Sequence, residues 1–185
     1  MNIRTSVSHP IRIDELPILN GWLGMSFCAG KKDVGDFSGI VWERDLEMDA
    51  LAIANWGATT WLNLMEESDM KRVSLEPMIF KNTIENLEIK YLHFPIIDAG
   101  VPTQADEKRW QEEISPFVLN ELTQGKKVFV HCRGGLGRTG IIAARILIDA
   151  GVSKDADEIM RIVRTARNNA IENTIQEDWI RKFAG

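Results

Sequence analysis

The segment from Lys127 to Ala150 constrains the fold of this chain more than any other. It begins with a short apolar run, Lys127–His131, continues through a glycine-rich loop, and ends in a stretch from about Arg138 to Ala150 that is apolar nearly all round. A continuous apolar run suits a central strand of a parallel sheet, and a helix that is apolar on every side is buried. The segment therefore predicts a buried strand and a buried helix joined by the loop.

Strands and helices are expected to alternate along the rest of the chain. β-branched and aromatic content predicts three more strands, at Trp22–Phe27, Thr59–Met65 and Leu87–Phe94. Apolar faces and capping signals predict four more helices: Glu43–Trp56, Thr103 to about Thr123 with a kink at Pro116, one that Ser153 caps, and Thr174 to about Phe183. Two of these helices have the spacing of a capping box, Thr103 with Asp106 and Thr174 with Glu177. Loops are expected at Gly30–Gly39 and Ile96–Gln104. This alternation predicts one α/β unit with a central, mainly parallel sheet flanked by helices.

Length and composition point to one globular domain. The chain has 185 residues, of which 44% are hydrophobic and 26% are charged, and a domain holds roughly 150 residues. No internal repeat or linker divides the chain. We therefore expect a single domain over residues 1–185, with residues 1–20 as an N-terminal extension.

Charge and cysteine usage narrow the classes of partner. The net charge of −5 suits neither duplex nucleic acid nor an anionic membrane surface, although a local basic pocket is compatible with it. No secretory signal is visible, and the most apolar stretch, Ile141–Ile148, contains Arg145 and is too short to span a bilayer. Two cysteines and three histidines at these spacings exclude a disulfide framework and argue against a metal site. These features predict a soluble, cytoplasmic protein with one functional thiol and no metal or other cofactor.

The loop after the predicted central strand, within His131–Gly140, is suited to hold a phosphate. Its glycines let the backbone curl so that several N–H groups point inward, and the positive end of the following helix aims at the same point. In open α/β sheets, ligands bind beyond the carboxyl ends of the strands. The candidate phosphate-binding residues are Arg133, Gly134, Gly135, Leu136, Gly137 and Arg138.

Cys132 opens this loop and is the candidate nucleophile. The inward N–H groups, the helix N-terminus and Arg138 all favour its thiolate over the thiol. The planar fork of Arg138 can take two phosphate oxygens at once, and the Thr139 hydroxyl can donate to the sulfur. An inert buried thiol needs neither the glycines nor Arg138. A rhodanese-like sulfurtransferase, which also has a cysteine loop before a helix, has no reason for Arg and Thr at these positions.

Cys132, Arg138 and Thr139 form a Cys-x5-Arg-Thr pattern that resembles the signature of the protein tyrosine phosphatase superfamily. The short domain and tight loop resemble its dual-specificity branch. The sequence motif His-Cys-x-Gly-Gly-Leu-Gly-Arg is similar in particular to that of the kinase-associated phosphatase (cyclin-dependent kinase inhibitor 3) family and its single-domain prokaryotic relatives. Four other stretches fit that family: Leu23-Gly24 with Cys28-Ala29-Gly30-Lys31, Arg44-Asp45-Leu46 with Trp56-Gly57, Phe94-Pro95-Ile96-x-Asp98-x-Gly100-x-Pro102, and Ala170-Ile171 with Gln176. The resemblance runs from about Leu23 to the end and implies a dual-specificity phosphatase-like fold and activity.

The leaving group of a phosphate ester needs a proton, and Asp98 is the candidate acid. It lies just after a predicted strand in a loop with Gly100 and Pro102, and it matches the acid position of the family. Its alternative role is to form a turn before Gly100. Asp106 is the second candidate, although capping of the following helix explains it adequately.

Three further residues have both a functional and a structural interpretation. Gln176 matches a family position that orients the hydrolytic water, or it is a surface glutamine near a helix cap. By the same resemblance His131 hydrogen-bonds around the loop and tunes the thiol, which overlaps with a role as a buried structural histidine. Arg133 adds positive potential at the pocket rim, or it is simply solvated.

Cysteines and tryptophans outside the loop are assigned to the core. We favour a core thiol for Cys28 over a partner that forms a disulfide with oxidised Cys132. Trp42, Trp56, Trp61 and Trp110 mostly fall on predicted core faces and receive no ligand role. His9 and His93 have no partner pattern for a metal.

The sequence predicts a cysteine-dependent phosphatase that needs no metal and hydrolyses phosphotyrosine and/or phosphoserine/phosphothreonine in proteins or peptides through a phosphocysteine. One alternative is a phosphoinositide or other small phosphoester phosphatase. Cys132–Arg138 contains no lysine, which argues mildly against a polyphosphorylated head group. Another alternative is a catalytically silent module that binds phosphorylated residues. The joint presence of Cys132, Arg138, Thr139 and Asp98 argues against it.

Overall fold

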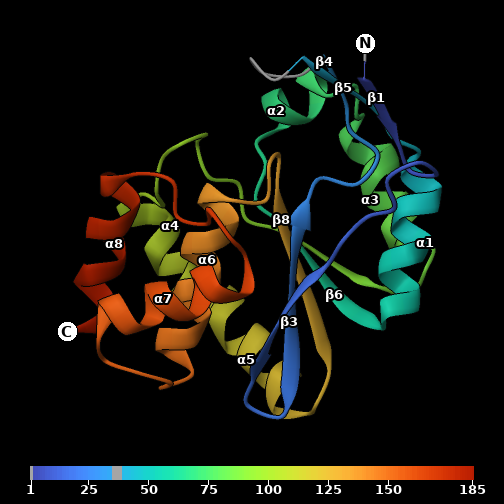
Figure 1. The fold of residues 1–185 in the computed structure, drawn as a ribbon. Helices are drawn as coiled ribbons and strands as arrows, with labels where there is room; N and C mark the ends of the chain where they lie inside the picture. Colours follow the sequence, from blue (N-terminus) through green and yellow to red (C-terminus); the bar gives the residue numbers. More distant parts are fainter. Residues whose placement is uncertain (1, 35–38) are drawn as a thin grey trace.

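The computed structural model describes residues 2–34 and 39–185, and within them a five-stranded sheet runs through the middle of the molecule (Figure 1). Its strand order is β2-β3-β8-β6-β7. The strands are β2 (Asp14–Ile18), β3 (Gly21–Phe27), β8 (Lys127–Cys132), β6 (Ala58–Asn63) and β7 (Lys90–His93). β3, β8, β6 and β7 run parallel, and β2 pairs antiparallel with β3 at one edge. The predicted α/β fold with a mainly parallel sheet is confirmed.

Helices cover both faces of this sheet (Figure 1). The helices of one layer are α1 (Leu46–Trp56) and α3 (Pro77–Glu85). Those of the other layer are α4 (Gln104–Arg109), α5 (Ser115–Thr123), α6 (Gly137–Asp149), α7 (Ala156–Ala166) and α8 (Thr174–Ala184). The short helix α2 (Glu67–Arg72) follows β6.

The sheet separates two hydrophobic cores because neighbouring strand residues point to opposite faces. Trp61 and Phe129 pack on the side of α1 and α3, whereas Leu62 and Val130, the next residues on the same two strands, pack on the side of α6. All four side chains are fully buried. Burial on both faces explains why the central strands read as continuous apolar runs in the sequence.

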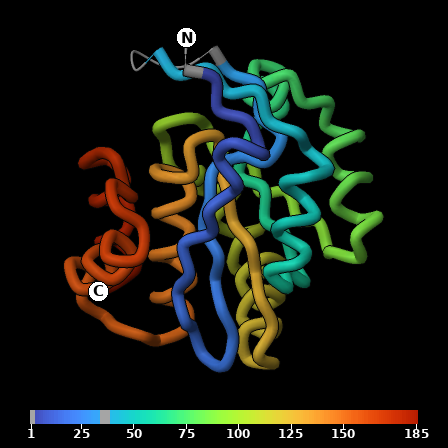
Figure 2. Tube along the Cα trace, turned by 45° about the vertical axis from the view of Figure 1, so that its right-hand side comes forward, coloured from blue at the N-terminus to red at the C-terminus, as the bar shows by residue number. Residues whose placement is uncertain are grey.

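The N-terminal stretch supplies strands to two sheets. β1 (Asn2–Thr5) pairs parallel with β5 (Ile40–Glu43), and β4 (Lys32–Val34) pairs antiparallel with β5. Figure 2 shows the chain running from this small sheet at the top of the molecule down beside the central strands, where it forms β2. The prediction of a loop over Gly30–Gly39 was wrong at Lys32–Val34, which forms β4. Residues 35–38 of that predicted loop lie outside the described part of the chain.

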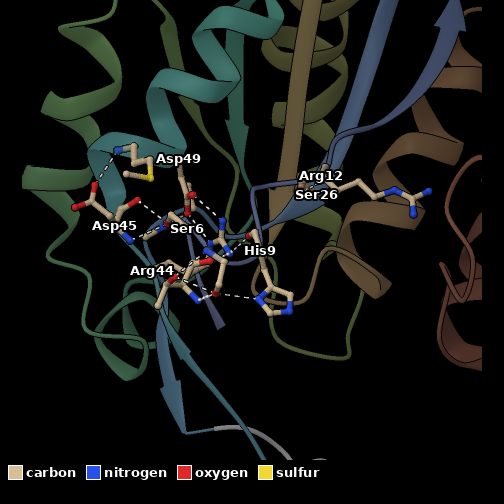
Figure 3. Close-up of polar contacts among 12 residues, drawn as sticks. Ser6, His9, Arg12, Ser26, Arg44, Asp45 and Asp49 are labelled. Carbon is tan, nitrogen blue, oxygen red and sulfur yellow. Dashed lines mark hydrogen bonds and ion pairs between the residues drawn. The ribbon is translucent and has the colours of Figure 1, made fainter. Parts of the chain in front are cut away.

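A buried arginine ties this N-terminal stretch to α1 (Figure 3). Nε and Nη2 of Arg44 each donate to Asp49 at 2.7 Å, and Nη1 donates to the His9 carbonyl at 2.8 Å. The backbone N–H of Asp45 donates to Ser6 Oγ at 2.9 Å. A fork–fork pair with its remaining donors satisfied stays rigid when it is buried. The network therefore fixes the start of α1 against the residues before β2.

The helix boundaries follow the side chains that cap them. Asp45 caps α1 by accepting from the Met48 N–H at 2.8 Å, so the helix begins after Asp45 and not at the expected Glu43. Gly57, in a left-handed conformation, ends the helix after Trp56, which is the predicted last residue. The capping box of Thr103 with Asp106 is confirmed.

Two other capping predictions were wrong by one or two residues. Asp155, not Ser153, caps α7, and Asn173, not Thr174, caps α8. In each case another residue with a short polar side chain lies close by and reaches the free N–H groups of the first turn.

The predicted kink at Pro116 coincides with an irregular part of the helix. Pro116 falls in the first turn of α5, directly after a π-helical turn over Trp110–Ile114. The helical backbone is continuous from Gln104 to Thr123, so the π-helical turn lies directly before a proline that removes one backbone N–H and crowds the preceding turn.

Candidate active site

The glycine-rich loop lies where the sequence predicts it, between the end of central strand β8 and the start of the buried helix α6. It opens into a cavity of about 440 Å³ at the carboxyl ends of the parallel strands. The loop residues that line this cavity are Cys132, Arg133, Gly134, Leu136 and Arg138. Its other lining residues are Lys31, Asp33, Trp42, Asp98, Ala99, Glu172 and Asn173.

Gly135 sets the curvature of the loop. Its φ of +70° is in the left-handed region, and an added Cβ would overlap the backbone carbonyl of Ser26 at the end of β3. In this conformation the Gly135 N–H donates to Cys132 Sγ at 3.2 Å. The loop thus directs a backbone dipole at the sulfur, as the predicted anion-binding nest requires.

Thr139 lies in the first turn of α6 with its hydroxyl available. The side chain is fully buried, and Oγ1 has no hydrogen-bond partner among the described residues. A buried hydroxyl without a partner is costly. Its position beside the cysteine loop suits donation to a sulfur or phosphate oxygen.

Arg138 is buried and binds two carboxylates and a carbonyl. Nη1 donates to Asp69 at 2.6 Å and to the Ile96 carbonyl at 3.0 Å, and Nη2 lies 2.8 Å from Asp98 Oδ1. Burial alone works against the charge, but Cys132, Asp69 and Asp98 outweigh it and raise the pKa of the guanidinium. Arg138 therefore presents a permanent positive charge in a fixed plane beside the cysteine.

Asp69 is a site residue that sequence reasoning missed. It lies on α2 and is 2% exposed, with Oδ2 on Arg138. The sequence around it, Glu66–Asp69, has the appearance of a solvated acidic stretch. No motif marks it, because its partner is 69 residues away in the chain.

Asp98 lies at the mouth of the cavity in the loop after β7. Its side chain is half exposed, in contrast to the buried Asp69. Asp106 takes no part: Oδ2 accepts from the Thr103 N–H and hydroxyl at 2.8 and 2.7 Å, and the residue does not line the cavity. Of the two acids that the sequence offered, only Asp98 lines the cavity with Cys132 and pairs with Arg138.

Gln176 is fully buried, so the alternative of a surface glutamine was wrong. Its Oε1 accepts from the Glu172 N–H at 2.8 Å, and its Nε2 lies 3.5 Å from the Gly100 carbonyl. An added Cβ on Gly137 would meet this amide. Gln176 thus packs behind the cysteine loop and connects it to the loop that carries Asp98, and its predicted role in orienting water stays a prediction.

His131 lies under the loop inside an aromatic cluster. Its ring stacks on Phe129 at 5.9 Å and meets Trp61 edge-on at 5.7 Å. Burial lowers the pKa of the imidazole to about 3, although its Nδ1 lies 3.3 Å from the Cys132 carbonyl. His131 is therefore neutral at physiological pH, in keeping with a buried histidine that supports the loop.

Arg167, which the sequence analysis did not single out, binds the outer side of the loop. Its Nε donates to the Gly135 carbonyl, and Nη2 lies 3.4 Å from the Gly134 carbonyl. Nη1 forms an ion pair with Asp14 of β2 at 2.7 Å. These contacts satisfy the carbonyls that turn outward when the N–H groups turn inward.

Arg133 lines the cavity, but its charge has a partner there. Its Nε and Nη2 both donate to Asp33 Oδ2, at 2.9 and 2.6 Å, so its charge is paired and not free at the rim.

The tryptophans differ in their positions. Trp42 was expected on a core face, but it lines the cavity. Trp61 and Trp110 are buried in the core as predicted.

Cys28 is a free, fully buried thiol, as favoured from the sequence. Burial raises its pKa well above the usual range, although the neighbouring charge of Lys31 acts in the opposite direction. Its Sγ lies 3.4 Å from the Ala29 carbonyl. Cys28 therefore stays protonated under the cavity wall.

Within the described part of the chain, no three histidine, cysteine, aspartate or glutamate side chains are grouped so that they could hold a metal ion. The same residues include no helix of the length and apolar character needed to cross a bilayer.

A cysteine and an arginine on one tight loop, between a central parallel strand and a buried helix, define the class of cysteine-loop phosphatases. Residues 47–184 match the family described as dual specificity phosphatase, catalytic domain, and the chain belongs to that family. Human cyclin-dependent kinase inhibitor 3 is 22% identical over 97% of this chain and 84% of its own. A solved structure of kinase associated phosphatase superposes with a TM-score of 0.81 at 21% identity and covers 94% of each chain. The predicted resemblance is confirmed.

A putative tyrosine phosphatase, 067L, of Invertebrate iridescent virus 3 is 24% identical over 83% of the chain. The chain spans 58% of the length of that viral relative.

Proposed function

We propose that this protein is a cysteine-dependent phosphatase that hydrolyses phosphotyrosine and/or phosphoserine/phosphothreonine monoesters. One observation carries the proposal: Cys132 Sγ accepts the Gly135 N–H in the same cavity wall that holds the Arg138 guanidinium. A nucleophile and a bidentate phosphate ligand on one rigid loop suit attack on a tetrahedral phosphoester. No metal or cofactor enters the proposed reaction.

In the first step the Cys132 thiolate attacks phosphorus. The sulfur–phosphorus bond forms as the bond from phosphorus to the leaving oxygen breaks. Arg138 and the loop N–H groups of residues 133–138 hold the other three oxygens and their charge. Asp98, as the acid, gives its proton to the leaving oxygen, and the dephosphorylated hydroxyl departs.

In the second step water attacks the phosphocysteine. The Asp98 carboxylate accepts a proton from the water, inorganic phosphate forms, and the sulfur leaves as a thiolate. The Thr139 hydroxyl, which has no other partner in the described structure, donates to that sulfur. Gln176 and His131 support the loop from behind.

The names of two relatives support a protein substrate. Cyclin-dependent kinase inhibitor 3 and kinase associated phosphatase both have a kinase in their names, and we propose a phosphorylated protein or peptide as the substrate of this chain. We also propose that residues 1–185 act as one phosphatase unit, to which the expected extension over 1–20 contributes β1 and β2. A thiolate nucleophile must stay reduced, so the reducing cytoplasm is the proposed location.

A small polyphosphorylated ester is the second candidate substrate, and one observation favours it. The cysteine loop has no lysine, but the fold brings Lys31 into the cavity wall. The net charge of −5 opposes approach to an anionic membrane. We therefore rank phosphopeptides first and include a soluble inositol phosphate in the test.

The test compares the wild-type protein with Cys132→Ser on phosphotyrosyl, phosphoseryl and phosphothreonyl peptides and on an inositol phosphate. We expect phosphate release by the wild type only, and retained peptide binding by the variant, because the backbone cradle and Arg138 remain. Cys28→Ser is the matched control and should keep turnover. Turnover by a clean Cys132→Ser preparation would contradict the phosphocysteine mechanism.

A further inference from the structure

A lysine that the proposed reaction does not use lies in the wall of the same cavity. Lys31 follows β3, and only 6% of its surface is exposed. Its Nζ lies 4.2 Å from the centre of the Trp42 ring and 4.9 Å from that of Phe27. Aromatic faces at this range attract a cation. Among the described residues, two aromatic rings and no acid hold the ammonium group at the cavity.

Within the described residues, no carboxylate lies within 4.0 Å of Lys31 Nζ. Asp33, whose charge favours the ammonium form, directs Oδ2 to Arg133 through two hydrogen bonds. Burial lowers the pKa of Lys31 to about 8, which fits a charge that its surroundings compensate only in part. A cation this deeply buried is normally paired with an anion. Lys31 borders a ligand cavity, so a bound ligand can supply that anion.

The position of Lys31 is fixed by the backbone around it. Gly30 has a φ of +68°, and its N–H donates to Asp49 Oδ2 at 3.0 Å. The Lys31 carbonyl accepts from the Arg44 N–H at 3.2 Å. Arg44 and Asp49 form the buried pair seen in Figure 3. The ammonium group therefore projects from a rigid segment, and little ordering is required when a ligand binds.

We propose that Lys31 is a specificity residue that binds a second anionic group of a phosphopeptide, a carboxylate or a further phosphate beside the phosphorylated residue. The inference rests on the proposed phosphatase function. The scissile phosphate belongs to Cys132 and Arg138. Among the carboxylates of the cavity wall, those of Asp98 and Glu172 disfavour a second anion, whereas that of Asp33 accepts two hydrogen bonds from Arg133. The side of Lys31 and Trp42 is the part of the cavity that accepts one.

Three peptides with the same phosphorylated residue test this inference, one flanked by aspartate, one by phosphoserine and one by asparagine. We expect the wild type to prefer the two anionic peptides. Lys31→Met keeps an apolar chain against Trp42 without the charge, and it should lower the ratio of kcat/KM for anionic over neutral peptides about tenfold. Lys31→Arg should keep most of the preference.

The neighbouring lysine provides the matched control. Lys32 is half exposed and pairs with Glu43 at 3.2 Å, away from the cavity. Lys32→Met should therefore keep the wild-type ratio. An unchanged ratio in Lys31→Met would overturn the proposal, and so would an equal loss on all three peptides, which would assign Lys31 to the scissile phosphate or to the fold.

Binding of the same peptides to Cys132→Ser, followed by fluorescence anisotropy, separates this inference from the proposed function. A preference for anionic peptides that depends on Lys31 supports the inference even where the wild type releases no phosphate. Failure of every peptide to bind would overturn both proposals. An inositol bisphosphate that binds more tightly than all three peptides would overturn the assignment to a phosphopeptide.

Discussion

At the scale of single residues, the fork of Arg138 is shared between two unequal carboxylates. Asp69 is buried and holds Nη1, whereas Asp98 is half exposed and holds Nη2. A phosphate in the cavity competes with the exposed partner for the guanidinium, because an exposed ion pair contributes little while a buried one is costly to break. We expect Asp69 to keep the plane of the fork and Asp98 to be released toward the leaving group.

Asp98→Asn tests the role of the acid. With a poor leaving group such as a serine alkoxide or tyrosine phenoxide, we expect kcat to fall on the order of 10²–10⁴-fold, the range of general acid catalysis. With an activated aryl phosphate, whose leaving group is already stable, the loss should be much smaller. The measurement is steady-state kinetics on both kinds of ester. Equal losses would show that Asp98 does not protonate the leaving group, and Asp106→Asn, which alters only a helix cap, is the control.

His131 predicts a pH dependence of stability. Its pKa is about 3 in the folded protein and near 6.5 in an unfolded chain. Above about pH 6.5 neither state binds the proton, and the contribution of the neutral histidine is fully present. As the pH falls from there toward 3, the unfolded state gains a proton that the folded state lacks. The free energy of unfolding should then fall by up to about 1.4 kcal/mol per pH unit.

Urea unfolding of the wild type and His131→Gln over this pH range measures the effect. The wild type should lose stability relative to the variant as the solution becomes more acidic. An NMR titration of the imidazole in the wild type gives a second readout, since the ring should remain neutral well below pH 6. Parallel stability curves, or protonation near pH 6.5 in the folded protein, would contradict the prediction.

At the scale of elements, the connection between β8 and α6 is fixed by backbone conformation. Gly135 combines a left-handed φ with a close approach to the Ser26 carbonyl, whereas Gly134 has open space around it. The loop can therefore accept a side chain at residue 134 but not at residue 135. The hydrogen bond to Cys132 Sγ comes from the N–H of Gly135, the residue that cannot change.

Gly135→Ala should destabilise the protein by more than about 2 kcal/mol, because strain and a backbone overlap add together. It should also reduce kcat/KM, since the N–H directed at the sulfur moves with the loop. Gly134→Ala is the matched control and should stay near wild type in both respects. Thermal unfolding and steady-state kinetics provide the readouts. Similar behaviour of the two variants would show that the loop adapts to a side chain at residue 135.

At the scale of the whole molecule, the cysteine loop is held by segments from both ends of the chain. Arg167, after α7, binds the Gly134 and Gly135 carbonyls and pairs with Asp14 of β2. The Arg167 guanidinium thus joins β2, the cysteine loop and the end of α7. Removal of this guanidinium should lower both the free energy of unfolding and the catalytic rate.

Arg167→Met should lower the free energy of unfolding by about 1–3 kcal/mol, the cost of leaving nearly buried acceptors unpaired. A corresponding fall in Tm and in kcat/KM is expected, because the loop carbonyls lose their anchor. Arg161→Met removes an exposed arginine of α7, the helix that precedes Arg167, and is the control. A drop in Tm with unchanged kcat/KM would show that Arg167 supports the fold without shaping the loop.

Features that depend on neighbours in the chain could be predicted from the sequence. Continuous apolar runs predict buried strands, Gly57 predicts the end of a helix, and the spacing of Thr103 and Asp106 predicts the start of another. The spacing of Cys132 and Arg138 belongs to the same kind of information, because six residues on one tight loop leave little freedom in where the two side chains point. Capping at Ser153 and Thr174 was wrong by one or two residues, since competing short polar side chains lie beside them.

Contacts between distant segments were decided by the tertiary structure. Three charged residues around the cysteine loop come from distant parts of the chain: Asp69 from α2, Lys31 from the segment before β4, and Arg167 from the residue after α7. The strand order of the sheet and its crossover connections bring these segments together. An ion pair across 69 residues leaves no periodicity in the sequence, because either partner alone has the appearance of an ordinary surface charge. The sequence by itself determined the cysteine loop and the class of fold. Only the packing of both helical layers and the N-terminal strands onto the sheet decided which charges surround that loop, since burial converts a solvated charge into one that must have a partner.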